Sequence, residues 1–585
     1  MALISKLSKE LLLEIFKYYI STSETEPIRY STPYRWTKLR LVCSYWKEIL
    51  ESPMLWNQVS VTSLRAMKFV LDHKPVVDLD MRGSLVDLAK PADQQKLVRM
   101  QRLAGGVRSI NLCTSKAVLK AWNAPTPRLK SLALRRMPGT PTTQAQVSDP
   151  STLLTRFRSP MLTKLELQGF TWNEVKPMLD DSIEDLALDL ILGMRVDEFA
   201  SAIKTMTHLR RLRTSYHSLT FLRALPLNTM EELMLVGLGQ VLDGDGLLAI
   251  VGQMQSLRRL EISTKVTKPS LDAAIIELPS LESITCLVRH HQEVEYLTRM
   301  KVPTLRHFRI SAGNNQSEND TGLQEILQLV LPLVHQVAKN IHLRTAQFSS
   351  PIPDLHLAFT DEPAADPDNG IQLNLCVNSH EEFLCFIANY FAPVLARVES
   401  AYIGDGRYYH RRSLPAWRSI FRQMGNVQSL HLEQRGAKAM PGGLHYYPKR
   451  GICKEVFPKL RNLYLDNVRF RPQRRKKNDN WGIKVAATKR SFLGDLERSF
   501  QLRDAAIESN NLRNGNNIES KDGAEFEEAV EGFEDRTRRK YWTKPKDDGK
   551  FRLVIRNAIR LHTRDVEKLT KPGRIVIWDS VSRRN

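Results

Sequence analysis

The sequence predicts a mixed α/β protein in three parts: a short helical module, a long irregular array of strand-and-helix repeats, and a basic, partly disordered extension. Three observations predict this arrangement. Two amphipathic segments lie within the first 60 residues, an apolar hexad recurs between residues 107 and 465, and the chain becomes polar and basic after residue 470. The predicted boundaries are 1–58, 59–470 and 471–585, with an insertion in the array at about 311–425.

The helical module is predicted from apolar residues at helical spacing. In the first segment the residues that share one face are Leu7, Leu11, Leu12, Ile15, Phe16 and Tyr19. Ser8 is a suitable N-cap for this helix, and a polar loop is predicted from Ser21 to Pro33. The apolar residues of a second predicted helix are Leu39, Val42, Cys43, Trp46, Ile49 and Leu50. Because so short a unit buries little surface, some of these side chains should face a partner; the alternative is an ordinary subdomain packed on the rest of the chain.

The array is predicted from a hexad of the form apolar-x-x-apolar-x-apolar. Clear copies begin at Val107, Leu129, Leu162, Ile183, Met230, Leu257, Leu305, Val427 and Leu460. Weaker copies begin at Leu209, Leu281, Ala338, Ile352 and Val398. From residue 107 to residue 305 the copies lie 21 to 27 residues apart with one interval of 33, mostly within the period of leucine-rich repeats. One such repeat cannot bury its apolar face alone, so neighbours must stack, and we expect an irregular leucine-rich-repeat solenoid.

Polar residues that alternate with the buried positions of each strand should share one face of the sheet. Several of them are basic, and we predict that a substrate contacts Arg211, Arg213, Arg259, His307 and Arg309. Arginine binds carboxylates and phosphates through two parallel hydrogen bonds, so an acidic or phosphorylated protein segment is the hypothesis. The alternative is that these charges are simply solvated.

The chain is strongly basic, with 86 Lys and Arg against 64 Asp and Glu and a net charge of +22. Residues 471–585 contain 28 basic and 18 acidic residues, which is nearly half of the excess. The basic cluster at 469–477 is typical of a nuclear localisation signal or a nucleic-acid contact, although a solvated linker is the commoner explanation. The closing segment Arg574–Trp578 is predicted to be a strand that caps the array.

Catalytic and targeting signals are sparse. The six cysteines include no C-x-x-C pair, which favours buried, reduced thiols in an intracellular protein. We expect no secretory signal and no membrane span, and therefore a cytoplasmic or nuclear protein. The sequence shows no phosphate-binding loop, dinucleotide fingerprint or nucleophile elbow, and no spaced metal ligands. We therefore expect a protein without cofactor, metal or catalytic residues.

Three blocks in the helical module carry a resemblance. Residues 7–16 follow the pattern Leu-Pro-x-Glu-Leu-Leu-x-x-Ile-Phe, 39–46 follow Leu-x-x-Val-Cys-x-x-Trp, and 52–56 follow Pro-x-Leu-Trp. In this order they resemble an F-box, and more narrowly the F-box of fungal proteins with a leucine-rich tail. Two departures are Ser8, where the family has proline, and a longer spacer between the first two blocks.

The resemblance implies a non-catalytic substrate receptor of a Skp-cullin-F-box ubiquitin ligase. Its partners would be a Skp-type adaptor with its cullin, and a protein substrate recruited by the repeats. The adaptor-binding positions that the motif implies are Leu7, Ser8, Leu11, Ile15, Leu39, Val42, Cys43, Trp46 and Leu55. Two alternatives stay open: a nuclear scaffold or nucleic-acid-associated protein that uses its basic surface and tail, and an F-box protein that works outside a ligase.

Overall fold

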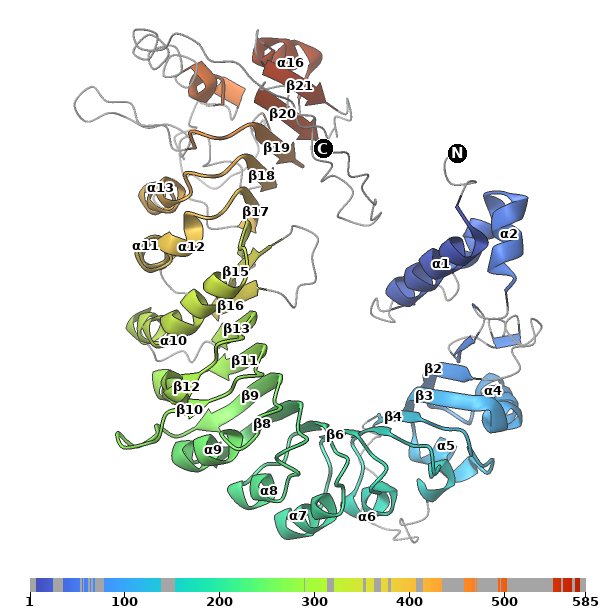
Figure 1. Cartoon of the computed structure of the whole chain (residues 1–585). Coiled ribbons are helices and arrows are strands. Elements are labelled where there is room, and N and C mark those ends of the chain that lie inside the picture. Colours follow the sequence, from blue (N-terminus) through green and yellow to red (C-terminus); the bar gives the residue numbers. More distant parts are fainter. Residues whose placement is uncertain are drawn as a thin grey trace, which may run out of the picture. The chain divides into compact units, whose positions relative to one another are not determined.

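Figure 1 shows the protein as a computed structural model. The residues that it describes are 7–24, 35–52, 55, 57–61, 64, 67–68, 78–137, 153–288, 290–312, 320–350, 354–361, 370–376, 380–406, 414–433, 457–468, 470, 493–494, 496–501, 551–558, 561–570 and 574–578. The chain divides into two compact units, Met1–Lys265 and Val266–Asn585. A short helical region precedes a large sheet of mainly parallel strands.

The helical module at the start of unit 1 consists of α1 (Lys9–Glu24), the 3-10 helix η2 (Arg35–Leu41) and α2 (Ser44–Leu50). Two sequence expectations need correction. The loop predicted from Ser21 begins later, because α1 continues to Glu24. The second predicted helix is two helices, because Cys43 has an extended backbone and its Sγ accepts a hydrogen bond from the Trp46 N–H at 3.5 Å, which caps α2.

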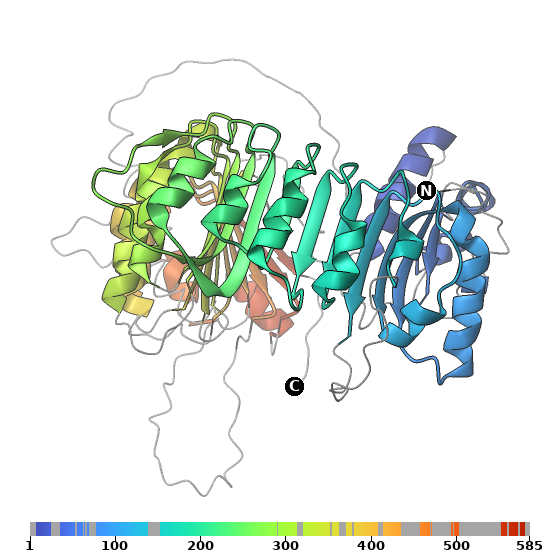
Figure 2. The same cartoon turned by 90° about the horizontal axis from the view of Figure 1, so that it is seen from below.

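Unit 1 continues as a sheet whose consecutive strands pair in parallel from β1 to β8. The strands are β1 (Gln58–Ser60), β2 (Leu79–Leu85), β3 (Val107–Thr114), β4 (Ser131–Arg136), β5 (Lys164–Gln168), β6 (Asp185–Asp189), β7 (Arg211–Thr214), β8 (Glu232–Leu242) and β9 (Arg259–Val266). The helices along one face of the sheet (Figures 1 and 2) include α4 (Pro91–Leu103), α5 (Lys116–Ala121), α6 (Trp172–Val175), α7 (Val196–Lys204), α8 (Leu219–Arg223) and α9 (Gly244–Val251).

The same backbone hydrogen bonds recur from strand to strand. The carbonyl of Lys130 accepts from the N–H groups of Thr163 and Lys164, both at 3.0 Å. Two strand pairs further, the carbonyl of Glu184 accepts from Arg210 and Arg211, both at 2.9 Å. The repeat of this detail shows that successive strand-and-helix segments of unit 1 are built alike.

The predicted hexads coincide with the strands. All three apolar positions of the nine clear copies are buried, and none is more than 4% exposed. In the copy at Leu162, for example, Leu165 and Leu167 alternate inward along β5, and Leu162 is buried just before the strand begins. The hydrophobic core of the sheet is therefore a row of branched side chains that continues through neighbouring strands.

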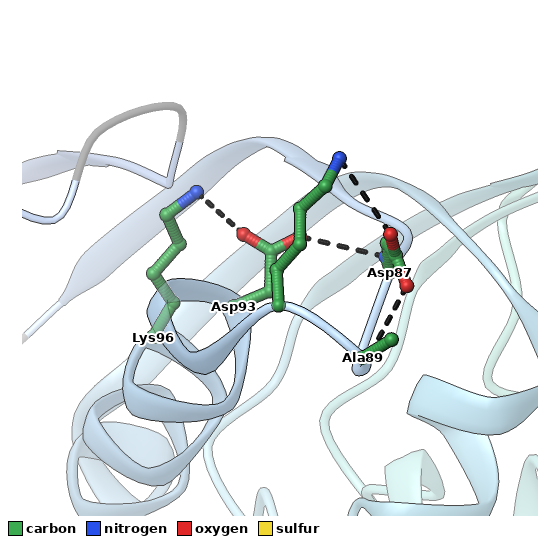
Figure 3. A network of polar contacts seen from close by, with 5 residues as sticks. Asp87, Ala89, Asp93 and Lys96 are labelled. Atoms are coloured by element: carbon green, nitrogen blue, oxygen red, sulfur yellow. Dashed lines mark hydrogen bonds and ion pairs between the residues drawn. The ribbon is translucent and has the colours of Figure 1, made fainter.

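The start of α4 is fixed by a polar network (Figure 3). Pro91 occupies the first helical turn, where its missing N–H costs nothing. The Asp93 carboxylate accepts a hydrogen bond from the Asp87 N–H at 3.4 Å and forms an ion pair with Lys96 at 2.8 Å. Asp87 in turn accepts from the Ala89 N–H at 3.0 Å. These contacts hold the loop that leads into the helix.

Unit 2 contains a second run of strands, and its spatial order differs from its order in the chain. Neighbouring strands are, in space, β11 (Ser283–Val288), β13 (His307–Ala312), β16 (Gly370–Cys376), β15 (Asp354–Thr360), β14 (Thr345–Ser350), β17 (Ser400–Gly406), β18 (Ser429–Glu433), β19 (Asn462–Asp466), β20 (Phe551–Arg556) and β21 (Arg574–Trp578). β15 is antiparallel to both of its neighbours, and the other pairs in this run are parallel. The small strands β10 (Ile276–Glu277) and β12 (Met300–Lys301) pair separately.

The helices in the described part of unit 2 include η8 (His291–Arg299), α10 (Asp320–Asn340), α11 (His380–Tyr390), α12 (Ala392–Leu395), α13 (Leu414–Gln423) and α16 (Thr563–Leu569). The weak hexad expected at Ala338 is wrong, because Ala338 lies inside α10. The strand that follows begins after Leu343 instead, and Leu343 is fully buried. The expected insertion at 311–425 contains β14 to β17, which continue the sheet of unit 2.

Gly370 begins β16 with φ of +129°, where a Cβ atom would lie 2.0 Å from the carbonyl oxygen of Phe359. Only glycine fits this close approach of two backbones. At the end of the chain, the segment expected to be a strand, Arg574–Trp578, is β21, whereas β20 was not anticipated. Apart from Phe470, the basic cluster at 469–477 lies outside the described residues, as do residues 478–492 and 502–550 of the polar stretch expected to be disordered. The expectation of disorder is wrong for 493–494 and 496–501, which are helical, with Leu493, Leu496 and Phe500 buried.

Candidate functional site

The core of the helical module contains side chains from α1 and α2. Leu12, Phe16, Ile49 and Leu50 are at most 2% exposed. The rings of Phe16 and Trp46 meet edge to face with centroids 5.1 Å apart, a favourable geometry for two aromatic rings. α1 and α2 are therefore packed into one small core.

Polar contacts at the rim fix the same helices. Lys9 Nζ and Glu48 Oε1 lie 2.9 Å apart, and the Tyr45 hydroxyl donates to the carbonyl of Leu7 at 3.3 Å. These residues are far apart in sequence, so the contacts define how α1 crosses α2. Exposed ion pairs contribute little to stability, so these contacts mainly fix the orientation of α1 relative to α2.

The outer surface of the helical module is rich in apolar side chains. Leu11 is 49% exposed, Val42 46% and Leu41 87%. Together with Tyr18 and Tyr19 they are five of the fifteen large apolar side chains that are exposed in the described part of the chain. Such a concentration on a small unit is typical of a protein-interaction surface.

Residues 7–62 match the family model described as F-box-like. The helical module therefore contains an F-box-like domain, which supports an F-box protein, and such proteins are typically receptor subunits of Skp-cullin-F-box ligases. No curated protein matches the chain significantly.

Among solved structures, a crystal structure of a Bacteroides fragilis protein is similar to 53% of this chain at 11% identity, with a TM-score of 0.21. The chain covers 60% of the length of that structure. A likeness this weak carries no conclusion about function.

The predicted adaptor-binding residues of the F-box-like domain separate into three groups. Ser8, Leu11, Val42 and Cys43 are exposed, as are many neighbours of the same helices. The half-buried members are Leu7, Ile15, Leu39 and Trp46. Leu55 is only 3% exposed and belongs to the core. The cysteine expectation also needs correction, because the thiol of Cys43 is exposed while that of Cys286 is buried.

Ser8 has a definite structural part in the F-box-like domain. Its Oγ accepts a hydrogen bond from the Leu11 N–H at 3.3 Å, and its carbonyl accepts from the Leu12 N–H at 3.0 Å. Ser8 therefore caps α1, where the family pattern has proline at the helix start. Both residue types begin a helix, by capping and by a preset φ respectively.

A row of charged residues crosses five neighbouring strands of unit 1. In register these are Lys164 on β5, Asp185 on β6, Arg211 on β7 and Glu232 on β8, and Arg259 on β9 continues the row. The Oδ2 atom of Asp185 lies 2.9 Å from Lys164 Nζ and 3.3 Å from Arg211 Nε. Arg259 Nη1 and Glu232 Oε2 are 3.7 Å apart. The signs alternate from one strand to the next.

Three of the predicted substrate residues, Arg211, Arg213 and Arg259, thus share one face of unit 1. The other two, His307 and Arg309, lie on β13 of unit 2. Arg309 is exposed, whereas His307 is only 6% exposed. The structure groups the predicted residues by unit: Arg211 and Arg213 lie on β7 and Arg259 on β9, with β8 between these two strands.

Unit 2 has an aromatic row that sequence reasoning did not single out. Tyr402, His431 and Tyr464 occupy matching positions on β17, β18 and β19. The rings of His431 and Tyr464 stack with centroids 3.9 Å apart and planes within 12°. Burial, together with the charge of Arg556, lowers the pKa of His431 to about 3. The signal in the sequence was a large ring at the same position of successive hexads.

The described residues offer no group of three or more His, Cys, Asp or Glu side chains arranged to hold a metal. Among the helices of the described part, none is long and apolar enough to cross a bilayer. The described surfaces offer apolar side chains and charged groups to a partner.

Proposed function

We propose that this protein is a substrate-recognition subunit of a Skp-cullin-F-box ubiquitin ligase. The F-box-like domain binds the Skp-type adaptor, and the adaptor links it to the cullin. The strand-and-helix segments of the two units recruit a protein substrate. The subunit acts in the cytoplasm or the nucleus and contributes effective concentration instead of a catalytic side chain.

The observation that carries this proposal is the F-box-like match over 7–62 on a module that exposes Leu11 and Val42. Neither side chain belongs to the core formed by Leu12 and Phe16, so both are available to a partner. Apolar anchors of this kind contribute most of the binding energy in protein interfaces.

The repeat character supports the second half of the proposal. We propose that the strand-and-helix segments are degenerate leucine-rich repeats that stack as a solenoid. The recurring double hydrogen bond to one carbonyl supports this; for example, the Glu399 carbonyl accepts from the N–H groups of Gln428 and Ser429 at 2.7 and 3.1 Å. A stacked array offers an extended strand face to a substrate.

Co-purification of the full chain with a Skp-type adaptor tests the proposal. The wild-type chain should bring down the adaptor, and Leu11→Asp or Val42→Asp should weaken binding at least tenfold. Asp at position 11 falls in the first turn of α1, where a negative charge suits the helix N-terminus, so the helix should persist. Leu271→Asp is the matched control, because Leu271 is 81% exposed in unit 2.

The controls decide the interpretation. The variants should keep the wild-type thermal unfolding profile, and Leu271→Asp should bind like the wild type. Adaptor capture that survives both Leu11→Asp and Val42→Asp, or a wild-type chain that captures no adaptor, would contradict the proposal.

A further inference from the structure

One side of the sheet of unit 1 bears charged residues whose sign alternates from strand to strand. We call this side the polar face of unit 1; its charged residues include Lys164, Glu166, Asp185, Arg211, Arg213, Glu232 and Arg259. At the first position of each strand, β5, β7 and β9 present a cation, while β6 and β8 present a carboxylate. Cations therefore recur on every second strand.

The two signs are not equally accessible. The side chains of Lys164, Arg211 and Arg259 are 48%, 44% and 43% exposed. The carboxylates between them are more enclosed, with Asp185 16% and Glu232 29% exposed. A partner that approaches this row meets Lys164, Arg211 and Arg259 first, because Asp185 and Glu232 lie recessed between them.

The arginines keep donors available. Arg211 uses Nε toward Asp185, and in the described part of the chain its two terminal nitrogens have no recorded hydrogen bond. Arg259 is 3.7 Å from Glu232, which is an ion pair beyond hydrogen-bond distance. Arg213 lies between Ala187 and Met234 in register, so neither neighbour in its row carries a charge. Guanidinium groups held this way can donate hydrogen bonds to carboxylates of another chain.

We propose that the polar face of unit 1 binds an extended acidic segment of the recruited protein whose carboxylates recur at every third residue. Neighbouring strands are about 4.8 Å apart, so cations on every second strand are about 9.6 Å apart. A polyproline II segment has three residues per turn and rises about 9.3 Å per turn, so its every third side chain points the same way. The spacing of the cations and the rise per turn of a polyproline II segment therefore agree along the row of Lys164, Arg211 and Arg259.

Other partner conformations fit this face less well. In a β-strand the side chains on one face repeat at about 6.7 Å and 13.4 Å, which straddle the cation spacing. In an α-helix, residues about two turns apart are separated by about 10.5 Å along the axis, which is longer than the spacing between the cations. The difference doubles between the first and the third cation. A continuous polyanion such as a nucleic acid would also place charge over the recessed Asp185 and Glu232, where it is repelled.

Two peptides of equal composition test the spacing. The first is (Glu-Pro-Pro) repeated three times, and the second has the three glutamates together before six prolines. Fluorescence anisotropy with the full chain should show the spaced peptide binding at least threefold tighter than the clustered one. A single-stranded DNA oligonucleotide of equal charge should bind no tighter than the clustered peptide.

Variants assign the preference to the named side chains. Arg211→Gln with Arg259→Gln should reduce binding of the spaced peptide at least fivefold. Asp185→Asn with Glu232→Gln should strengthen binding of the clustered peptide and reduce the preference, because the face then becomes continuously basic. Arg158→Gln is the matched control: its side chain is 58% exposed and ion-paired with Asp180, outside the polar face.

This inference rests on the proposed function only for the origin of the acidic segment. Its failure can be distinguished from a failure of the proposed function. Equal binding of the two peptides, tighter binding of the DNA, or an unchanged preference after the Asp185 and Glu232 substitutions would overturn it. Adaptor capture by the F-box-like domain would be unaffected by any of these results.

Discussion

Arg136 at the end of β4 donates a hydrogen bond from Nη2 to Oε1 of Glu174 at 2.9 Å, and the Glu174 side chain is only 1% exposed. The guanidinium also lies over the ring of Phe170, 4.4 Å from its centroid. Burial opposes ionisation of Glu174, but the hydrogen bonds from Arg136 and the Thr171 N–H outweigh it and lower its pKa. This buried ion pair links β4 to α6.

Arg136→Met should destabilise this part of unit 1 by about 3–5 kcal/mol, because it leaves the Glu174 carboxylate buried without its partner. Amide hydrogen exchange in β4 and β5 measures the local change. Arg158→Met is the control: its ion pair with Asp180 is exposed and should matter by less than about 1 kcal/mol. Equal effects of the two substitutions would contradict the structural role of the pair.

His431 should stay neutral down to a pH near 3, because burial and Arg556 lower its pKa to about 3. The unfolded chain would protonate this histidine near pH 6.5. Between these two values the unfolded state binds more protons, so this residue makes the free energy of unfolding decrease as the pH falls. Below pH 3 its contribution is fully lost.

NMR titration of histidine side chains checks this expectation, with His431→Gln to assign the resonance. The His431 signal should show no titration above pH 4. The variant should also lose part of the stability decrease between pH 6.5 and pH 4. A His431 titration midpoint near 6.5 would show that the stacked ring is open to water.

Ser8→Ala should destabilise the N-terminal turn of α1 by about 0.5–2 kcal/mol, because the Leu11 N–H loses its capping oxygen. Ser8→Pro should recover part of this loss, since proline suits a helix start. Hydrogen exchange of the first α1 amides measures both effects. Ser44→Ala is the control, because Ser44 is an exposed residue at the start of α2 with no recorded side-chain hydrogen bond in the described part of the chain. If Ser8→Ala leaves the exchange unchanged, the cap contributes nothing.

The strands of unit 1 were predictable because each is a local pattern. In the hexad of Leu162, three apolar residues define the strand and its inward face without reference to any other segment. The F-box-like domain was predictable in the same way, from three short blocks. Even there, the sequence could not tell that Leu55 is buried and Val42 is exposed, since that depends on how α1 crosses α2.

The errors arose where a helix boundary or a contact between distant segments decides the structure. The apolar spacing at Ala338 fits a strand hexad, but Ala338 itself lies within the long amphipathic helix α10, which continues to Asn340. The apolar run from Leu39 to Leu50 fits one helix, yet Cys43 interrupts it. The charge row was visible only as scattered residues, because the pairing of Asp185 with both Lys164 and Arg211 follows from the register of three strands.

The strands β14, β15 and β16 of unit 2 lie in the sheet in the reverse of their order in the chain, and this order affects folding kinetics. Where each strand pairs with the next one in the chain, the sheet can grow by adding one segment at a time. β13 instead pairs with β16, so His307 meets Gly370 across a stretch that contains α10, β14 and β15. β13 therefore cannot pair with β16 until this whole stretch has been synthesised and folded back. Loops of this length slow folding, so the reversed stretch is where unit 2 is most exposed to wrong strand pairing while the chain is still incomplete.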